Sequence, residues 1–269
     1  MAEIRIGCSG WSYRAWDGPF YPKGMQPGDY LEFYSTVFGT VEIDSTFYSI
    51  PPQNSVKKWD KSAQEGFQFS PKLPREITHE RRLRNAALVM EQFMMSIAPL
   101  RRKAGVVLIQ LPPSMNYDES SIDFRNFIED LPNDWQFAVE FRHNSWFRED
   151  VYKIMEDNNV TMAWSEIPMA KNPARTTSDR VYLRLVGDRA IDESSFGSII
   201  RDMNPVMEWW AGKVKSLGDD IKKVYVYSNN HFQGFGPGTV NLFRKALGLD
   251  PVKWPESYQK VPGNQKTLF

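Results

Sequence analysis

The sequence predicts an α/β protein built as a single (β/α)8 barrel of the TIM type. Eight short β-type runs recur along the chain, helical patterns separate most of them, and 269 residues is the usual size of such a barrel. Strands joined through helices pair in parallel. The rival fold, an open doubly wound sheet, carries a Gly-rich phosphate turn after its first strand, whereas this chain has GCSGW there.

The expected strands are short runs rich in β-branched, aromatic and aliphatic residues. No shift in composition marks a domain boundary between them, so we expect one barrel over residues 1–255 and a C-terminal tail over 256–269. In chain order the strands are IRIGCSG (4–10), TVEIDS (40–45), FQFSPK (67–72), GVVLIQLP (105–112), QFAVEFR (136–142), TMAWSE (161–166), RVYLRLVG (180–187) and KVYVYSNN (223–230).

The expected helices carry apolar residues at the i, i+3, i+4 spacing of an amphipathic face. Pro205 fits an early helical position, and Gly218 and Gly248 fit helix ends. Segment 166–180 shows no helical pattern, so we expect a long loop at the barrel mouth there. The helical segments are 29–38, 54–63, 82–100, 122–131, 148–158, 205–217 and 239–248.

The alternation of side chains along each strand predicts what faces the lumen. Helices cover the outside of a parallel barrel, so the apolar positions face outward and the polar positions face inward. Most of these polar residues lie near the carboxyl ends of their strands, where such barrels place active sites. The predicted lumen set is Glu42, Asp44, Lys72, Gln110, Glu140, Arg142, Arg184 and Asn229.

Two explanations compete for this charge. The carboxylates and cations could pair with one another in a purely structural lattice, because buried charges persist only when they are paired. Alternatively, they line a site that binds a charged substrate. We favour the site, because apolar residues often stabilise a core better than an equal number of desolvated charges.

Several long motifs resemble the YecE-like family, also called domain of unknown function 72. They are SGWSYRAW (9–16), VEIDSTFY (41–48), PKLPREITHERRL (71–83), LIQLPPS (108–114), VEFRHNSW (139–146), VYLRL (181–185) and SNNH (228–231). The resemblance implies a TIM-type barrel and assigns no reaction. The chain departs from the family pattern at Asp44, Val186 and Ser228, where Asn, His and Phe are usual. The implied mouth residues are Trp11, Glu42, Lys72, His79, Gln110, Glu140, Arg142, His143, Trp146, Arg184, Asn229 and Asn230.

Metal and nucleophile chemistry find little support in the sequence. The chain has three histidines and one cysteine, with no HExxH, CxxC or paired-histidine spacing, so no metal site is expected from these residues. A single divalent ion on Glu42, Asp44 and Glu140 stays open as an alternative, because carboxylates and water suffice for magnesium. Cys8 is expected to be a small buried packing residue.

Acid–base chemistry on a phosphate-bearing or polyhydroxy substrate fits the predicted lumen best. Glu140 or Glu42 would be the general base, and His143 would shuttle a proton. Whether the enzyme would be a hydrolase, a lyase or an isomerase stays open. The expected binding residues are Lys72, Arg142 and Arg184 as an anion cradle, Gln110, Asn229 and His79 as polar contacts, and Trp11 and Trp146 as stacking surfaces for a sugar-like ligand.

A second hypothesis is a nucleic-acid-associated protein. HERRLRN (79–85) and LRRK (100–103) are basic, although the 33 Lys and Arg residues only balance the 33 Asp and Glu residues. The tail QKTLF resembles the short peptides that dock on DNA sliding clamps, with Gln265, Leu268 and Phe269 as the contact residues. Lys266 stands where bacterial clamp peptides usually have Leu.

The chain start MAEIRIGCSGW lacks the architecture of a signal peptide, and no apolar run approaches the roughly 20 residues that cross a bilayer. The single cysteine excludes an intramolecular disulfide framework. We therefore expect a cytoplasmic protein with no membrane partner.

Overall fold

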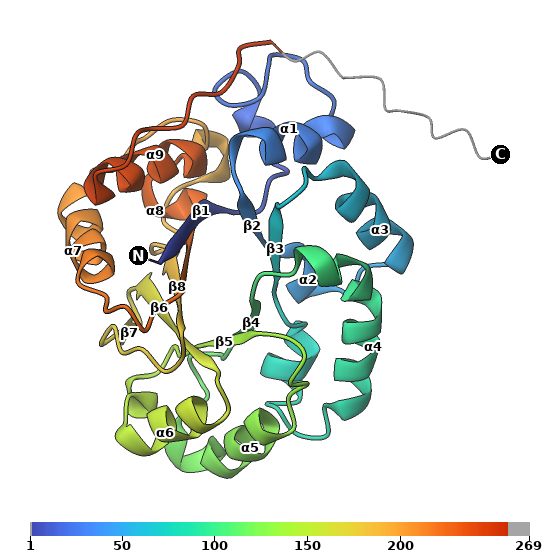
Figure 1. Cartoon of the computed structure of the whole chain (residues 1–269), viewed down its shortest axis with the longest axis vertical. Helices are drawn as coiled ribbons and strands as arrows, with labels where there is room; N and C mark the ends of the chain where they lie inside the picture. Colours follow the sequence, from blue (N-terminus) through green and yellow to red (C-terminus); the bar gives the residue numbers. More distant parts are fainter. Residues whose placement is uncertain (1, 258–269) are drawn as a thin grey trace.

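Eight parallel strands form a nearly closed barrel in the computed structural model, which describes residues 2–257 (Figure 1). Their order around the barrel is β3-β2-β1-β9-β8-β6-β5-β4. All eight expected strands are present, with ends that differ by a few residues. Their bounds are β1 (Glu3–Ser9), β2 (Thr40–Ile43), β3 (Gln68–Pro71), β4 (Val107–Gln110), β5 (Phe137–Glu140), β6 (Thr161–Ile167), β8 (Arg180–Leu185) and β9 (Lys223–Ser228).

The ring closes between β3 and β4 through isolated bridges rather than a continuous ladder. Phe69 pairs with Ala104 and Lys72 pairs with Leu108. The backbone N–H of Leu73 donates to the carbonyl of Leu108 at 2.8 Å, and that of Gly105 donates to the carbonyl of Phe69 at 2.7 Å. This seam leaves no long exposed sheet edge, and it places Lys72 beside β4.

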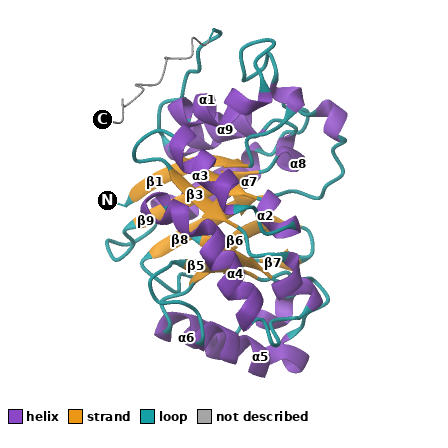
Figure 2. Cartoon of the chain, turned by 90° about the vertical axis from the view of Figure 1, so that its right-hand side faces the viewer, coloured by secondary structure: helices purple, strands orange, loops and turns teal. Residues whose placement is uncertain are grey.

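Helices surround the strands (Figures 1 and 2). In α6, Val151, Ile154 and Met155 are buried at i, i+3 and i+4, as an amphipathic helix requires. The α-helices are α1 (Tyr30–Val37), α2 (Ser45–Tyr48), α3 (Gln53–Ser62), α4 (Ala87–Ile97), α5 (Tyr117–Glu129), α6 (Glu149–Asp157), α7 (Asn204–Lys215), α8 (Asn230–Gln233) and α9 (Gly236–Leu247). Short helical turns are η1 (Arg14–Trp16), η2 (Pro27–Asp29), η3 (Glu76–Glu80), η4 (Ala98–Lys103), η5 (Asn144–Trp146) and η6 (Glu193–Ser195).

Several local features differ from the sequence prediction, among them an earlier start of α5, at Tyr117, and the following two. Helix α4 starts at Ala87 rather than at residue 82, because Arg82, Leu83 and Asn85 have φ angles of 50°, 69° and 49°, which a right-handed helix does not allow. Segment 166–180 has no helix, as expected, but it contains the short strand β7 (Ala170–Lys171), which pairs antiparallel with the end of β6.

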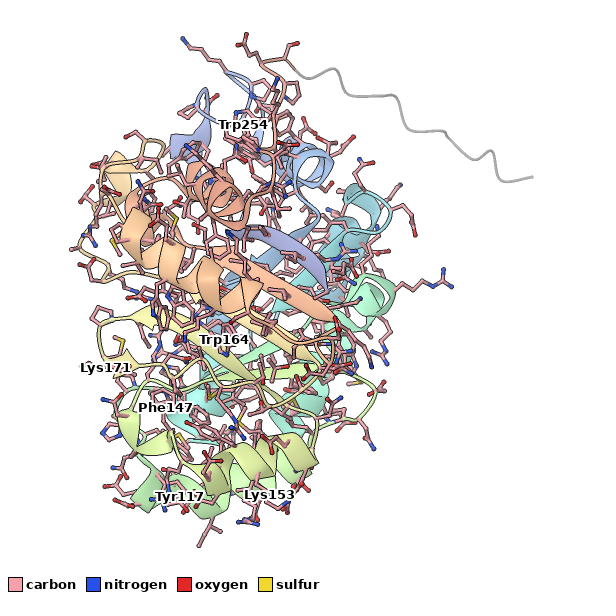
Figure 3. The ribbon with its side chains drawn as sticks, turned by 60° about the vertical axis from the view of Figure 1, so that its left-hand side comes forward. Tyr117, Phe147, Lys153, Trp164, Lys171 and Trp254 are labelled. Atoms are coloured by element: carbon pink, nitrogen blue, oxygen red, sulfur yellow. The ribbon has the colours of Figure 1, made fainter. Side chains whose placement is uncertain are left out.

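Side chains divide between two cores as the strand alternation predicted. Val41, Val139 and their apolar neighbours belong to the large core between strands and helices. Trp164 of β6, labelled in Figure 3, points outward in this way and stacks on Trp210 of α7 with the ring centroids 5.9 Å apart. A separate cluster fills the lumen, composed of Val106, Leu108, Ala138, Ala163, Tyr182, Tyr225 and Tyr227.

Tyrosines close the lower part of the lumen. The Tyr227 hydroxyl lies 2.8 Å from the Thr40 hydroxyl and 2.7 Å from the Ser70 hydroxyl. The Tyr225 hydroxyl donates to the Gln68 side chain at 2.8 Å. Because this layer is packed and hydrogen-bonded, any ligand must approach from the opposite end, where the strands have their carboxyl ends.

The last described residues return to the N-terminal part of the chain. The Trp254 indole N–H donates to the Pro19 carbonyl at 3.1 Å, and its ring centroid lies 5.3 Å from that of Phe20. Trp254 is labelled in Figure 3. The clamp-like residues Gln265, Leu268 and Phe269 lie outside the described residues. Within residues 2–257, no helix has the length and apolar character that a membrane crossing requires.

Candidate functional site

Three strands bring two carboxylates and one guanidinium together in the lumen. Arg184 of β8 binds Glu42 of β2 through two hydrogen bonds, Nη2 to Oε1 at 2.7 Å and Nε to Oε2 at 2.8 Å. Its Nη1 donates to Oε2 of Glu140 on β5. The Tyr182 hydroxyl also donates to Glu42 at 2.7 Å. Both carboxylates are fully buried and Arg184 is 2% exposed, so this lower layer does not contact bulk solvent.

Arg142 continues the network outward from Glu140. Its Nε donates to Oε1 of Glu140 at 2.6 Å, so each oxygen of that carboxylate binds a different guanidinium. Gln110 Oε1 lies 3.4 Å from Arg184 Nη1. Two carboxylates and two guanidinium groups therefore balance in charge, which is the condition under which buried ions remain stable.

The network fixes the ionisation of Glu140. Burial alone would raise its pKa, but the charges and hydrogen bonds of Arg184 and Arg142 outweigh burial and lower the pKa to about 2. Such a carboxylate accepts a proton poorly at neutral pH. In Glu42, both oxygens are held by Arg184. The general-base role that the sequence suggested for these two glutamates therefore does not fit their contacts, which instead hold the two arginines in position.

An upper layer lies nearer the carboxyl ends of the strands, at Asp44, Lys72 and Arg142. Asp44 and Arg142 each follow a glutamate of the lower layer by two residues. Asp44 Oδ1 is 3.6 Å from Lys72 Nζ and 3.7 Å from Arg184 Nη2. The side-chain exposure is 5% for Lys72, 11% for Arg142 and 28% for Asp44, against 0% for the glutamates below. Exposure thus rises toward the carboxyl ends of the strands, and the upper layer is the part that solvent reaches.

Phe47 of α2 joins the upper layer to His79 of η3. The Lys72 amine lies 4.1 Å from the centroid of the Phe47 ring, and the His79 ring packs edge-on against it at 4.9 Å. Burial lowers the pKa of Lys72 to about 8, although Asp44 opposes this shift. Burial and the charges of Lys72 and Arg142 lower the pKa of His79 to about 4, so its imidazole is neutral at pH 7.

Two serines in the lumen were not selected from the sequence. Ser9 pairs in register with Glu42, and Ser165 pairs with Arg184. Because paired residues on neighbouring parallel strands point to the same face, both hydroxyls enter the lumen at the level of the ion pairs. Both are buried, and neither finds a hydrogen-bond partner within residues 2–257. Strand parity alone would have indicated them.

The structure does not bring every predicted residue to this cluster. Trp146 is fully buried in the outer core, where its indole N–H donates to the Met115 carbonyl at 2.7 Å and its ring stacks on Phe141. Trp146 therefore cannot stack on a ligand at the mouth. His143 is exposed, and its Nδ1 lies 2.8 Å from the Ser145 hydroxyl, which makes it an anchor of η5 rather than a proton shuttle.

Other predicted residues have local structural contacts. The Asn229 side chain accepts the backbone N–H of His231 at 3.0 Å and caps α8. Asn230 accepts the indole N–H of Trp16 at 3.1 Å. Trp11 is half-buried and packs edge-on against Trp59 with the ring centroids 5.6 Å apart. None of these contacts joins the residue to the ionic cluster.

The carboxylates do not form a metal site of the kind that the sequence left open. No group of three or more His, Cys, Asp or Glu side chains in the described part of the chain could hold a metal ion. Arg184 lies between Glu42 and Glu140 and binds both, so its guanidinium occupies the position that a divalent ion would need. The donor set therefore does not fit the magnesium alternative.

Most basic side chains in segments 79–85 and 100–103 are paired with surface carboxylates. Arg81 lies 2.7 Å from Glu76, Arg84 lies 2.7 Å from Asp123, and Arg101 lies 3.3 Å from Asp134. These side chains form ion pairs on solvated faces. Such pairing leaves little unbalanced positive charge to attract a phosphate backbone.

Comparison with known proteins identifies the family. The family described as "Protein of unknown function DUF72" matches residues 5–265. The chain belongs to this family. A crystal structure of a DUF72 family protein from Thermotoga maritima superposes with a TM-score of 0.77 at 26% identity, over 91% of this chain and 99% of that chain. A crystal structure of a DUF72 family protein from Enterococcus faecalis superposes with a TM-score of 0.71 at 21% identity, over 93% of this chain and 99% of that chain. At this identity the likeness shows the fold alone.

Two curated relatives of this DUF72 chain match part of it. UPF0759 protein YunF of Bacillus subtilis is 30% identical over 156 residues, and UPF0759 protein YecE of Escherichia coli K12 is 30% identical over 145 residues. These matches cover 56% and 54% of the chain. The chain spans about half the length of these relatives, 54% and 50% respectively.

Proposed function

We propose that this DUF72 protein is an enzyme whose barrel mouth binds a small phosphate-bearing or polyhydroxy anion and transfers a proton to or from it. The observation that carries the proposal is the two-layered arrangement. A buried, charge-balanced network below holds Arg142 and surrounds Arg184, while Asp44, Lys72 and Arg142 face the solvent-accessible end above it. Barrel enzymes bind their substrates at this end.

Arg142 and Lys72 bind the anion in this proposal. Only the Nε of Arg142 is used, in its bond to Glu140, and its two Nη groups make no hydrogen bond within the described residues. These groups form the fork that suits a phosphate or carboxylate. Glu140 and Glu42 are positioning residues, because both are fully buried and orient the guanidinium groups of Arg142 and Arg184.

Asp44 and His79 are the groups that suit proton transfer. Asp44 is the most exposed carboxylate of the cluster, and its Oδ1 contacts Lys72 and Arg184 only at ion-pair distance. His79 is half-buried, and its imidazole is kept neutral by burial and by the neighbouring cations, which lower its pKa to about 4. In this proposal Asp44 exchanges the proton with the ligand, and the neutral imidazole of His79 relays it onward.

Unpartnered polar groups favour a site over a purely structural lattice. A structural network is expected to satisfy its buried donors and acceptors. Here the hydroxyls of Ser9 and Ser165 lie in the lumen without a hydrogen-bond partner among residues 2–257.

Isothermal titration calorimetry against inorganic phosphate, glycerol 3-phosphate and ribose 5-phosphate tests this function. We expect at least one to bind, and Arg142→Met to weaken binding at least tenfold while circular dichroism shows the folded protein. Arg101→Met is the matched control, because Arg101 forms an exposed ion pair with Asp134 and lies outside the cluster. Equal binding by the wild type and the folded Arg142→Met variant, or no binding of any of the three anions to the wild type, would contradict the proposal.

A further inference from the structure

The Lys72 amine differs from a structural buried lysine. Its side chain is 5% exposed, yet its Nζ makes no hydrogen bond within residues 2–257, and the carboxylate that it faces lies at 3.6 Å. Lys103 in the same protein shows the structural arrangement. Its side chain is 13% exposed, and its Nζ donates to the carbonyls of Asp60 at 2.6 Å and Ala63 at 2.9 Å. A buried ammonium is expected to satisfy its donors in this way.

Burial of Lys72 increases the uncharged fraction of its amine. The Phe47 ring covers the amine on one side, Asp44 favours the ammonium, and the positive charge of Arg184 opposes it. Burial and this charge lower the pKa of Lys72 to about 8, so half of the amine is uncharged at pH 8. A lysine nucleophile requires this form, and desolvation together with a nearby cation is the usual way to produce it.

We propose that Lys72 is a nucleophile that forms a Schiff base with a small aldehyde or ketone carrying an anionic group. This inference rests on the proposed function, because Arg142 must hold the anion while Lys72 reacts. The substrate of the barrel mouth is then an aldehyde or ketone, and its reaction proceeds through an iminium ion.

The step balances without any further reagent. Nζ attacks the carbonyl carbon, a C–N bond forms, and a proton passes from nitrogen to the carbonyl oxygen to give a carbinolamine. Asp44, 3.6 Å from Nζ, is placed to carry this proton. A second proton, taken from solvent, reaches that oxygen; the C–O bond then breaks, water leaves, and the nitrogen lone pair forms the C=N bond of the iminium. The sum is amine plus carbonyl plus one proton giving iminium plus water.

The cluster accommodates the product without a change in charge. The iminium carries the same single positive charge as the ammonium that it replaces, so it keeps its attraction to Asp44 and its place over the Phe47 ring. The cation then withdraws electrons from the neighbouring C–H or C–C bond. Asp44 is the carboxylate beside it that can remove a proton from that carbon.

Reductive trapping tests the inference. The full chain is incubated with dihydroxyacetone phosphate, glyceraldehyde 3-phosphate or pyruvate and then treated with sodium borohydride, and adducts are mapped by peptide mass spectrometry. We expect an adduct on Lys72 at least tenfold above that on Lys57, an exposed lysine of α3. The two phosphates and the carboxylate distinguish which anion the site takes.

Variants separate this inference from the proposed function. Lys72→Arg is expected to lose the adduct, and Lys103→Arg, whose amine lies outside the cluster, is expected to keep both the adduct and anion binding in calorimetry. If anions bind to the wild type but Lys72 is trapped no more than Lys57, the Schiff base is refuted and the anion site stands. If the wild type neither binds anions nor is trapped, both proposals fail.

Discussion

Glu140→Gln perturbs the buried network most cleanly, because it removes one charge and preserves the shape of the side chain. The pKa of Glu140 falls from the ordinary 4.5 to about 2 on folding. At about 1.36 kcal/mol for each pKa unit, ionised Glu140 stabilises the folded state by about 3 kcal/mol at pH 7. Breaking one partner of a buried ion pair costs about 3–5 kcal/mol in general, which agrees.

The pH dependence of this loss follows from the direction of the shift. Because the folded pKa lies below the unfolded one, the stabilisation is fully present above about pH 4.5 and is lost as the pH falls toward 2. Urea unfolding of the wild type and Glu140→Gln should therefore differ by about 3 kcal/mol at pH 7 and by roughly half of that at pH 3.

Glu149→Gln is the matched control. Its side chain is 83% exposed and lies 3.7 Å from Arg175, so the substitution should change the free energy of unfolding by less than about 0.5 kcal/mol at both pH values. A loss below about 1 kcal/mol in Glu140→Gln, or a loss that is the same at pH 7 and pH 3, would refute the assignment of Glu140 as an ionised, doubly paired carboxylate.

Three further perturbations probe the same architecture. Arg184→Met should lower the free energy of unfolding, measured in urea, by about 3–5 kcal/mol, because Glu42 loses its cation. The double variant Arg184→Met with Glu42→Gln should recover part of that loss, and no recovery would argue against an energetic coupling of the two side chains. Tyr227→Phe should lower the free energy of unfolding by about 1–3 kcal/mol, because the buried hydroxyls of Thr40 and Ser70 lose a hydrogen-bond partner. An unchanged free energy of unfolding would contradict the packed lower layer. Cys8 is fully buried with a raised thiol pKa, so iodoacetamide should label it only in denaturant; rapid labelling of the native protein would show an open first strand.

The sequence predicted the strands well because each is a short apolar run whose alternation is undisturbed. In TVEI, Val41 and Ile43 face the helices while Glu42 faces the lumen, and the structure follows this parity. The start of α4 was less predictable. An apolar period continues back through Leu83, but positive φ angles at this residue and its neighbours break the helix, and periodicity carries no information on φ.

The candidate site was predictable in composition and less so in roles. Parity and the rule that barrel sites lie at strand carboxyl ends were enough to select Glu42, Glu140 and Arg184. Periodicity could not show which oxygen binds which nitrogen, so it could not separate the positioning glutamates from Asp44. Trp146 illustrates the other limit, because a position just beyond a strand end can turn back into the outer core.

A crystal structure of the full chain grown with dihydroxyacetone phosphate tests the central claim, that the ionic layer at the barrel mouth is a binding site. We predict phosphate density within hydrogen-bond distance of the Arg142 guanidinium and continuous density from the ligand to Lys72 Nζ. A mouth that holds only solvent, with the Glu42–Arg184–Glu140 network intact beneath it, would contradict the claim and leave the charges with a structural role alone.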